Sequence, residues 1–387
     1  MADFGIICET NPMHNGHKYL IDEARNAGAD RIICIMSGNT VQRGEFAIID
    51  KYTRAKALVE CGADLVIELP FPWCSSSAEY FALAGMSIAK NYCDALIFGS
   101  ETGNIEVLTI AAQVASEEDF REDYNKKLES GEQAAKIYRT LLESKTGYKL
   151  SSNDLLGIEY IRASIKLGCQ INFVTVSRKG DGYNDTEISD KKYPSATALR
   201  KIWIENTFED AKNFIPESAY EVYKKAICEN MLTDTNELDS AILAFFRLKS
   251  GDDLADISGA ESGLANRFCE KSQSARSLDE LISLVKTKRY TDSHLRRFLL
   301  HCLAGVTEED IKSFPREALL LAANDKGREL LSKKRKSDTF SVITKPADLN
   351  EGYRQNILTN KIDMVFTLAH KNKLPGDTYM KKRPYIK

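Results

Sequence analysis

The 387-residue sequence lacks several features that would assign a protein class at once. Its nine cysteines form no CxxC pair and no cluster at metal-ligand spacing, which argues against a structural metal site. No run approaches the roughly 18 apolar residues of a membrane-spanning helix, and no basic leader precedes the first apolar segment. The formal net charge is only −3, so a polyanionic partner must be held by local basic patches. We therefore expect a cytoplasmic protein with reduced thiols, no membrane association and no structural metal.

Short apolar segments alternate with helical patterns through the first half of the chain. The apolar segments are residues 4–8, 31–36, 65–69, 95–98 and 171–176, and the helical patterns cover residues 17–26, 51–61, 78–90 and 154–165. Buried parallel strands read as continuous apolar runs, and intervening helices predict βαβ units. The prediction is an α/β fold with a Rossmann-like parallel sheet. The polar loops should converge at the carboxyl ends of its strands, where such sheets bind ligands.

The pattern changes after about residue 206. Helix-like segments then follow one another, with breaks at Pro216, Pro315 and Pro346, among others. Residues 342–366 carry a weak strand signal. The chain is therefore predicted to divide into an α/β domain of residues 1–205 and a mainly α-helical C-terminal domain of residues 206–387.

One short motif carries the chemical signal. His14-Asn15-Gly16-His17 follows the first predicted strand and opens the first helix, where exposed backbone N–H groups and the helix dipole favour phosphate. Two imidazoles three residues apart lie on the same side of that turn, and Gly16 leaves the backbone open to a nucleotide. Composition alone predicts about 0.004 HxGH matches in this chain, so chance is a poor explanation. A metal site is a weak alternative, because no third ligand stands at suitable spacing.

Five sequence blocks extend this match beyond the motif. They are GIICETNPMHNGH (5–17), MSGNTVQRGE (36–45), GADLVIELPF (62–71), FGSE (98–101) and SNDLLGIEY (152–160). A strand followed by HxGH and a helix resembles the nucleotidyltransferase superfamily, which includes the class I aminoacyl-tRNA synthetases. The five blocks together resemble the bacterial tRNA(Met) cytidine acetate ligase family. The chain departs from that pattern at Thr10 and Thr40, where aromatic residues are common, and at Met13 and Phe46.

The resemblance implies an ATP-dependent ligase. Such an enzyme activates acetate to acetyl-adenylate, releases pyrophosphate, and acetylates N4 of the wobble cytidine of elongator tRNA(Met), with Mg²⁺ accompanying the ATP phosphates. The resemblance assigns catalysis to His14 and His17. It assigns ATP binding to Ile7, Cys8, Glu9, Asn11, Pro12, Asn15, Gly16, Leu20, Gly99, Asn153, Arg178, Ser195, Thr197 and Arg200.

Four of these residues have simpler interpretations. Asn153 and Ser195 precede or open predicted helices, so each alone predicts a helix N-cap. Arg178 alone predicts a solvated loop charge, and Arg200 a surface charge on a helix. The resemblance favours ATP binding for all four.

Basic residues in the second half suggest an RNA partner. Residues 286–297 (KTKRYTDSHLRR) hold five basic residues against one acid, with a tyrosine available to stack on a base. The candidate RNA-binding residues are Lys286, Lys288, Arg289, Tyr290, Arg296 and Arg297. Residues 333–336 and 381–383 form further basic patches, and Arg43 is a candidate for the acetate or cytidine end of the site.

Two other functions remain open. One is an adenylyltransferase acting on a small phosphate-containing metabolite, which would need no RNA-binding domain. The other is a non-catalytic RNA-binding protein that retains an ATP fold. The basic patches of the second half count against the first, and the intact pair of His14 and His17 counts against the second.

Overall fold

A computed structural model describes residues 2–177, 196–205, 208–260, 263–334 and 339–387. At its centre lies an eight-stranded sheet with the order β10-β8-β5-β2-β1-β6-β7, in which β9 also pairs with β8. Neighbouring strands are parallel, except that β8 runs antiparallel to β5. The strands are β1 (Asp3–Cys8), β2 (Arg31–Ser37), β5 (Leu65–Leu69), β6 (Ala95–Ser100), β7 (Asn172–Ser177), β8 (Glu317–Ala323), β9 (Ser341–Ile343) and β10 (Tyr385–Ile386).

Helices cover both faces of this sheet, as the alternating pattern predicts. From β1 the chain moves outward to β2 and β5 through α1 (Asn15–Asn26) and α2 (Lys51–Glu60). It then returns through α3 (Ala78–Ala89) to β6 and continues to β7 in the opposite direction. Because βαβ connections are right-handed, this reversal puts α3 on the other face from α1 and α2. The reversal makes the gap between the carboxyl ends of β1 and β6 the expected ligand site.

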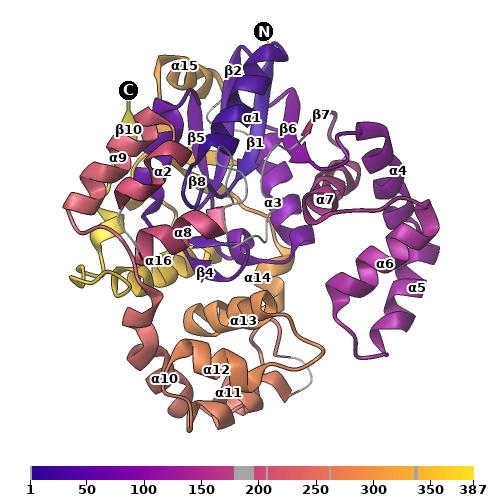
Figure 1. Cartoon of the computed structure of the whole chain (residues 1–387), viewed down its shortest axis with the longest axis vertical. Coiled ribbons are helices and arrows are strands. Elements are labelled where there is room, and N and C mark those ends of the chain that lie inside the picture. Colours follow the sequence, from indigo (N-terminus) through magenta and orange to yellow (C-terminus); the bar gives the residue numbers. More distant parts are fainter. Residues whose placement is uncertain (1, 178–195, 206–207, 261–262, 335–338) are drawn as a thin grey trace.

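The remaining helices of the first half pack beside α3. Helix α7 (Ser152–Leu167) packs against α3 and against α4 (Ile105–Ser116), while α5 (Glu118–Leu128) and α6 (Ala134–Thr146) form an outer hairpin (Figure 1). The four helices predicted from sequence are confirmed within about two residues at each end. Their boundaries follow from capping, since the Asp50 side chain caps α2 and Gly168 ends α7 with a left-handed conformation, φ 59°.

The second half is mainly helical, as predicted. Helices α10 to α13 form a lobe at the bottom of Figure 1, and α9 packs against α2. The helices after the gap at 178–195 are α8 (Ala196–Glu205), α9 (Glu217–Cys228), α10 (Asp239–Arg247), α11 (Leu264–Ser272), α12 (Leu278–Val285), α13 (Asp292–Ala304), α14 (Glu308–Lys312), α15 (Asp325–Lys334) and α16 (Arg354–Thr367).

The second half also contributes strands that the sequence analysis did not predict. Strand β8 extends the sheet beside β5, and its segment EALLLAA is buried throughout. Such a run of Ala and Leu fits a buried helix as well as a strand, so periodicity does not distinguish them. Within residues 342–366, only the end of β9 is a strand, and α16 occupies residues 354–367. The division at residue 205 remains a prediction, and the sheet draws on both sides of it.

Candidate functional site

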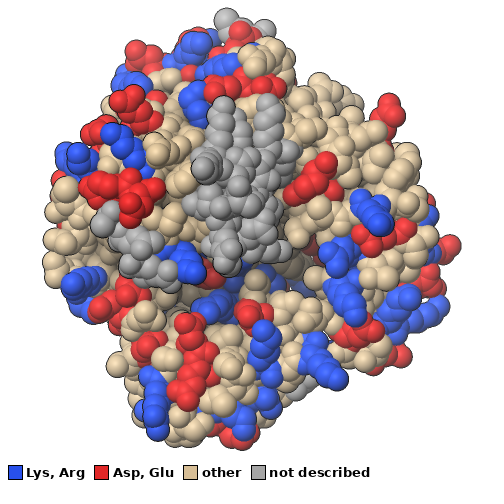
Figure 2. Space-filling view, viewed as in Figure 1, with Lys and Arg blue, Asp and Glu red and all other residues tan. Residues whose placement is uncertain are grey.

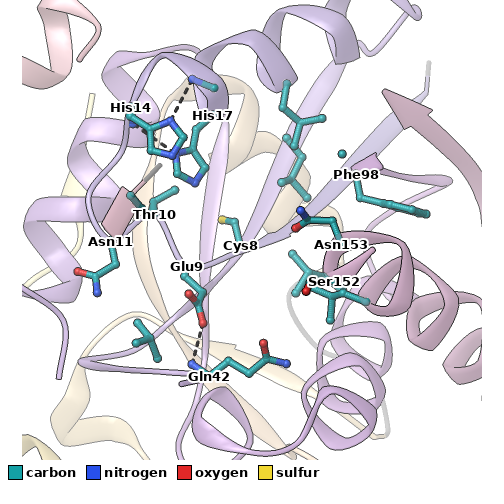
Figure 3. A pocket seen from close by; sticks show the side chains of 18 of the residues that line it. Cys8, Glu9, Thr10, Asn11, His14, His17, Gln42, Phe98, Ser152 and Asn153 are labelled. Carbon is teal, nitrogen blue, oxygen red and sulfur yellow. Dashed lines mark hydrogen bonds between the residues drawn. The ribbon is translucent and has the colours of Figure 1, made fainter. Parts of the chain in front are cut away.

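A cavity of about 370 Å³ lies at the carboxyl ends of β1 and β6 (Figure 3). Its walls come from the end of β1, the start of α1, the turn between β3 (Thr40–Val41) and β4 (Glu45–Phe46), and the starts of α3, α7 and α8. Small-molecule sites commonly measure about 300–1,000 Å³, so the volume suits a nucleotide-sized ligand. The predicted site residues that line it are Ile7, Cys8, Glu9, Asn11, His14, Gly16, His17, Leu20, Gly99, Asn153, Thr197 and Arg200.

The structure does not place four predicted ATP-binding residues in this wall. Pro12 is not among the lining residues, and neither is Asn15, whose side chain donates to the Asn213 carbonyl at 3.0 Å. Arg178 and Ser195 lie outside the described residues. The assignments of all four to ATP binding remain predictions.

His14 and His17 fix each other at the start of α1. The Nδ1 atom of His14 accepts a hydrogen bond from the Gly16 N–H at 3.0 Å, and Nδ1 of His17 accepts one from the His14 N–H at 3.3 Å. An Nδ1 atom that accepts a hydrogen bond carries no proton, so the ring proton of each neutral histidine is on Nε2. Both rings therefore have an Nε2–H group that can donate to a phosphate.

Gly16 is required by the position of the His14 ring. A Cβ atom at residue 16 would lie 2.8 Å from Cε1 of His14, closer than carbon atoms approach without displacement. The sequence analysis attributed this glycine to the approach of a nucleotide. The structure adds a second reason, because only glycine lets the imidazole fold back onto the helix start.

Helix α7 presents its N-terminus to the same cavity. Ser151 caps this helix by a reciprocal capping box with Asp154, so Asn153 is not the cap that its position alone predicted. The Asn153 side chain instead donates to Glu101 at 2.6 Å, and both Ser152 and Asn153 line the cavity. The exposed N–H groups of the first turn and the helix dipole make this end suitable for electronegative groups of a ligand.

Arg200 lies in the cavity wall and is not a surface charge. Its Nη1 donates to the Asn11 carbonyl at 2.9 Å, and its Nη2 lies 3.5 Å from Glu45 and 3.3 Å from the Thr197 hydroxyl. Within the described residues, Arg43 and Arg200 are the Lys or Arg residues that line the cavity. Arg43 comes from the β3–β4 turn, and its assignment to the acetate or cytidine end of the site remains a prediction.

Glu9 lies between the histidine pair and the β3–β4 turn (Figure 3). Its Oε1 accepts a hydrogen bond from the Gln42 N–H at 2.7 Å. Burial raises the pKa of Glu9 above its ordinary value, while the Gln42 N–H and the charges of Arg200 and Arg43 act in the opposite direction. A carboxyl group with a raised pKa inside a cavity is a frequent feature of functional sites.

Two buried cations of α2, Lys51 and Arg54, were not predicted as site residues. Lys51 is 1% exposed and contacts Glu68 at 2.7 Å and Asp363 at 2.8 Å. Burial alone would lower the pKa of Lys51, but Asp363 and Glu68 outweigh it and raise that pKa above its ordinary value. Arg54 donates to the carbonyls of Glu9 at 2.6 Å and of Ile49 at 3.0 Å. Arg54 thereby holds the end of β1 at the cavity wall, while Lys51 joins β5 to α16.

The spacing of Lys51 and Arg54 was the only sequence signal for this role. Three residues apart, they share a helix face with Ala55 and Leu58, which are buried. In the sequence analysis they belong only to the helical pattern of residues 51–61.

The predicted RNA-binding segment, residues 286–297, adjoins the cavity through the β3–β4 turn. Arg297 donates to the Gln42 carbonyl at 3.1 Å, and burial lowers the pKa of Arg297 to about 10. Arg296 pairs with Asp279 at 2.7 Å, and Lys286 pairs with Asp292 at 2.8 Å.

Lys288 and Arg289 are exposed cations of the same segment. The Tyr290 ring stacks on His294, with centroids 4.9 Å apart, and the Arg289 guanidinium lies 5.9 Å from the Tyr290 centroid. Burial lowers the pKa of His294 to about 4, so this ring adds no charge at pH 7. One face of Tyr290 is therefore already occupied by a neutral ring.

The other basic patches lie elsewhere. Helix α15, which carries Lys333 and Lys334, is at the opposite end of the molecule from α12 and α13 (Figure 1). Lys333 also pairs with Glu329, and Lys381 with Asp377. The described part of the first patch, Lys333 and Lys334, therefore does not form one continuous surface with residues 286–297, and residues 335 and 336 lie outside the described part of the chain. Figure 2 shows basic side chains around the hollow between the α10–α13 lobe and the rest of the chain, interspersed with acidic ones.

Two negative findings apply to the described residues. They contain no group of three or more His, Cys, Asp or Glu side chains that could hold a metal ion. None of their helices combines the length and apolar character that crossing a bilayer requires.

Comparison with known proteins identifies the family. The model of the HIGH nucleotidyl transferase family matches residues 1–378. The tRNA(Met) cytidine acetate ligase of Caldanaerobacter subterraneus subsp. tengcongensis is 32% identical over 96% of each chain, and that of Clostridium perfringens is 34% identical over 88% of this chain and 89% of its own. The apo crystal structure of Thermotoga maritima TmcAL superposes with a TM-score of 0.91 at 29% identity, covering 100% of this chain and 99% of that one. The T. maritima protein was also crystallised with alpha-thio ATP, and that structure gives a TM-score of 0.88 at 28% identity. The cavity that contains the HxGH motif lies where the strand order of the sheet reverses. The chain that forms it belongs to the tRNA(Met) cytidine acetate ligase family of HIGH nucleotidyl transferases.

Proposed function

We propose that this protein activates acetate with ATP and transfers the acetyl group to N4 of the wobble cytidine of elongator tRNA(Met). The observation that carries the proposal is the pair of His14 and His17 at the start of α1, in the wall of a nucleotide-sized cavity, in a chain of this ligase family. The reaction takes place in the cytoplasm, where its RNA substrate is found.

In the first step, an acetate oxygen attacks the α-phosphorus of ATP and pyrophosphate leaves. Positioning and charge stabilisation are the main requirements of such a step. The Nε2–H groups of His14 and His17 donate to phosphate oxygens that gain charge, and Arg200 supplies positive charge in the same wall. Asn153 and the start of α7 hold the nucleoside end.

Mg²⁺ fits this site as a companion of the nucleotide. Magnesium commonly binds substrate phosphates and water, with one or two carboxylates, and does not need a complete protein cage. The described lining is poor in carboxylates, and the described residues contain no cluster of three protein ligands. Phosphate oxygens and water would therefore hold most of the ion, which would neutralise charge on the leaving pyrophosphate.

One experiment separates this proposal from its rivals. ATP–pyrophosphate exchange is measured with and without acetate, and nucleosides from tRNA incubated with the enzyme are analysed by mass spectrometry. Acetate-dependent exchange together with N4-acetylcytidine is the expected result. Exchange that does not depend on acetate would favour an adenylyltransferase that acts on a phosphate-containing metabolite. The absence of exchange, with tRNA still bound, would favour a non-catalytic RNA-binding protein.

The exposed cations of residues 286–297 supply the RNA contact in this proposal. Lys288 and Arg289 project from the segment that adjoins the cavity, and removing one cation that binds a phosphate should lower the salt slope of binding by about one. The double variant Lys288→Ala/Arg289→Ala should therefore raise the KM for tRNA and reduce that slope by about two. Lys333→Ala, on distant α15, is the matched control. Equal effects of the two changes on tRNA binding would refute this placement.

A further inference from the structure

Glu9 is held in place at both its main chain and its side chain. Arg54 donates to the Glu9 carbonyl at 2.6 Å, and the Gln42 N–H donates to its Oε1 at 2.7 Å. Within the described residues, no other hydrogen bond reaches the carboxylate. Glu9 is also one of the residues that line the cavity. Figure 3 shows the carboxylate pointing away from the histidine rings and toward the β3–β4 turn.

This end of the cavity faces the predicted RNA-binding segment. The same Gln42 residue that donates to Glu9 accepts a hydrogen bond from Arg297 of α13 through its carbonyl. Gln42 therefore contacts both Glu9 and helix α13. The histidine pair, by contrast, uses its Nδ1 atoms to cap α1 at the other end.

The two steps of the proposed reaction differ in their need for a base. Acetate is already an anion, so its attack on ATP releases no proton. In acetyl transfer, N4 of cytidine forms a bond to the carbonyl carbon while the bond from that carbon to the phosphate oxygen breaks. The electron pair of the broken bond leaves with AMP, and one N4 proton must pass to an acceptor. A carboxylate positioned at the amine would serve this second step alone.

We propose that Glu9 is the catalytic base that accepts the N4 proton during acetyl transfer, an inference that rests on the proposed function. The other lining carboxylate, Glu45, lies 3.5 Å from Arg200 and is thereby a weaker candidate. The charged groups around Glu9 are Arg43 and Glu45 of the turn and strand β4, Arg200 of α8 and Arg54 of α2, with the histidines of α1 in the same cavity. Burial raises the pKa of Glu9, which makes its ionised form a stronger proton acceptor than a surface glutamate.

The test is the variant Glu9→Gln, which keeps the size of the side chain and removes the proton acceptor. Single-turnover acetyl transfer to a tRNA(Met) transcript and acetate-dependent exchange are measured on the same preparation. Transfer should fall by about a hundredfold or more, and at least about tenfold further than exchange. The wild-type transfer rate should decline as pH falls through the Glu9 pKa, because protonation removes the base, and the variant should lose this dependence.

Two further variants make the result decisive. Glu45→Gln makes the same chemical change in the same cavity and should alter transfer and exchange by a common factor. Glu9→Asp keeps a carboxylate one methylene further back, so transfer should be slower with its pH dependence preserved. Equal losses of transfer and exchange in Glu9→Gln, or an unchanged pH profile, would overturn the inference and leave the adenylate phosphate as the acceptor. Failure of wild-type exchange to respond to acetate would instead refute the proposed function.

Discussion

The orientation of single imidazole rings determines what the motif can do. His17 closes the cap of α1 and, in the proposed reaction, also directs an Nε2–H group to the phosphates, so His17→Ala should remove two functions. ATP–pyrophosphate exchange should fall by about 10²–10³-fold, as for the loss of one transition-state donor. The free energy of unfolding should fall by about 1 kcal/mol, as for a lost cap.

His17→Asp separates the two functions. Its carboxylate can still accept the His14 N–H but cannot donate to phosphate at neutral pH. Exchange should be lost to a similar extent while stability in urea stays near wild type. Exchange within about threefold of wild type in His17→Ala would contradict the assignment.

At the residue scale, the sequence predicted the residues of the motif better than those that support it. His14, His17, Asn153 and Arg200 were predicted, and all four line the cavity. Lys51 was not, because a charged side chain in a helical pattern predicts exposure unless its partners are known. One of those partners, Asp363, is 312 residues away in the chain, and no local pattern contains that pairing.

At the scale of elements, the β3–β4 turn depends on one glycine. Gly44 has φ +78°, and a Cβ atom there would lie 2.3 Å from the Arg297 backbone nitrogen. Gly44→Ala should therefore push the turn away from α13 and carry the Gln42 N–H away from Glu9. We expect the free energy of unfolding to fall by about 1–3 kcal/mol and acetyl transfer to slow.

Gly131→Ala is a matched control for this change. Gly131 has a similar φ of +73°, but nothing lies within 4 Å of the added Cβ. Gly131→Ala should lower the free energy of unfolding only by the cost of the left-handed conformation, about 1 kcal/mol, and should leave acetyl transfer unchanged. Urea unfolding and single-turnover transfer, measured on both variants, check the difference. Normal transfer in Gly44→Ala would show that the turn tolerates displacement.

Elements whose ends carry local signals were predicted well. Helix α2 begins directly after its cap, Asp50, where the helical pattern begins, whereas α7 is capped by Ser151 and not by Asn153, the residue that the sequence pattern suggested. Strand β8 was not predicted, because its Ala and Leu residues have no strand-specific period and its partner β5 is remote in the chain. Sheet membership of that kind depends on tertiary packing, which local propensity does not encode.

For the whole molecule, the buried cluster of Lys51, Glu68 and Asp363 joins both halves. Lys51→Met would leave two buried carboxylates without their cation, so the free energy of unfolding should fall by about 3–5 kcal/mol. Lys126→Met is the control, since Lys126 is 73% exposed and its pairing with Glu122 is weak. Urea denaturation of both variants checks the difference. A loss below about 1 kcal/mol in Lys51→Met would contradict the role of the cluster.

At this scale the class of fold was predictable from the sequence, whereas the packing of the C-terminal segments onto the sheet of the first half was not. Five parallel strands and their helices follow from hydrophobic periodicity within residues 1–177, and all five are confirmed. The return of the chain through β8, β10 and α16 depends on contacts with segments of the first half that lie hundreds of residues away. The predicted boundary at residue 205 therefore separates segments that these contacts join.

The antiparallel strand β8 has a consequence for how the protein is made. A ribosome releases β5 about 250 residues before β8, so the nascent catalytic half emerges with one sheet edge uncovered. Lys51 and Glu68 likewise lack their partner Asp363 until that residue has been synthesised. Unpaired strand edges and incomplete burial favour aggregation and attract chaperones. The cavity should thus reach its final form only after β8 and α16 have also left the ribosome.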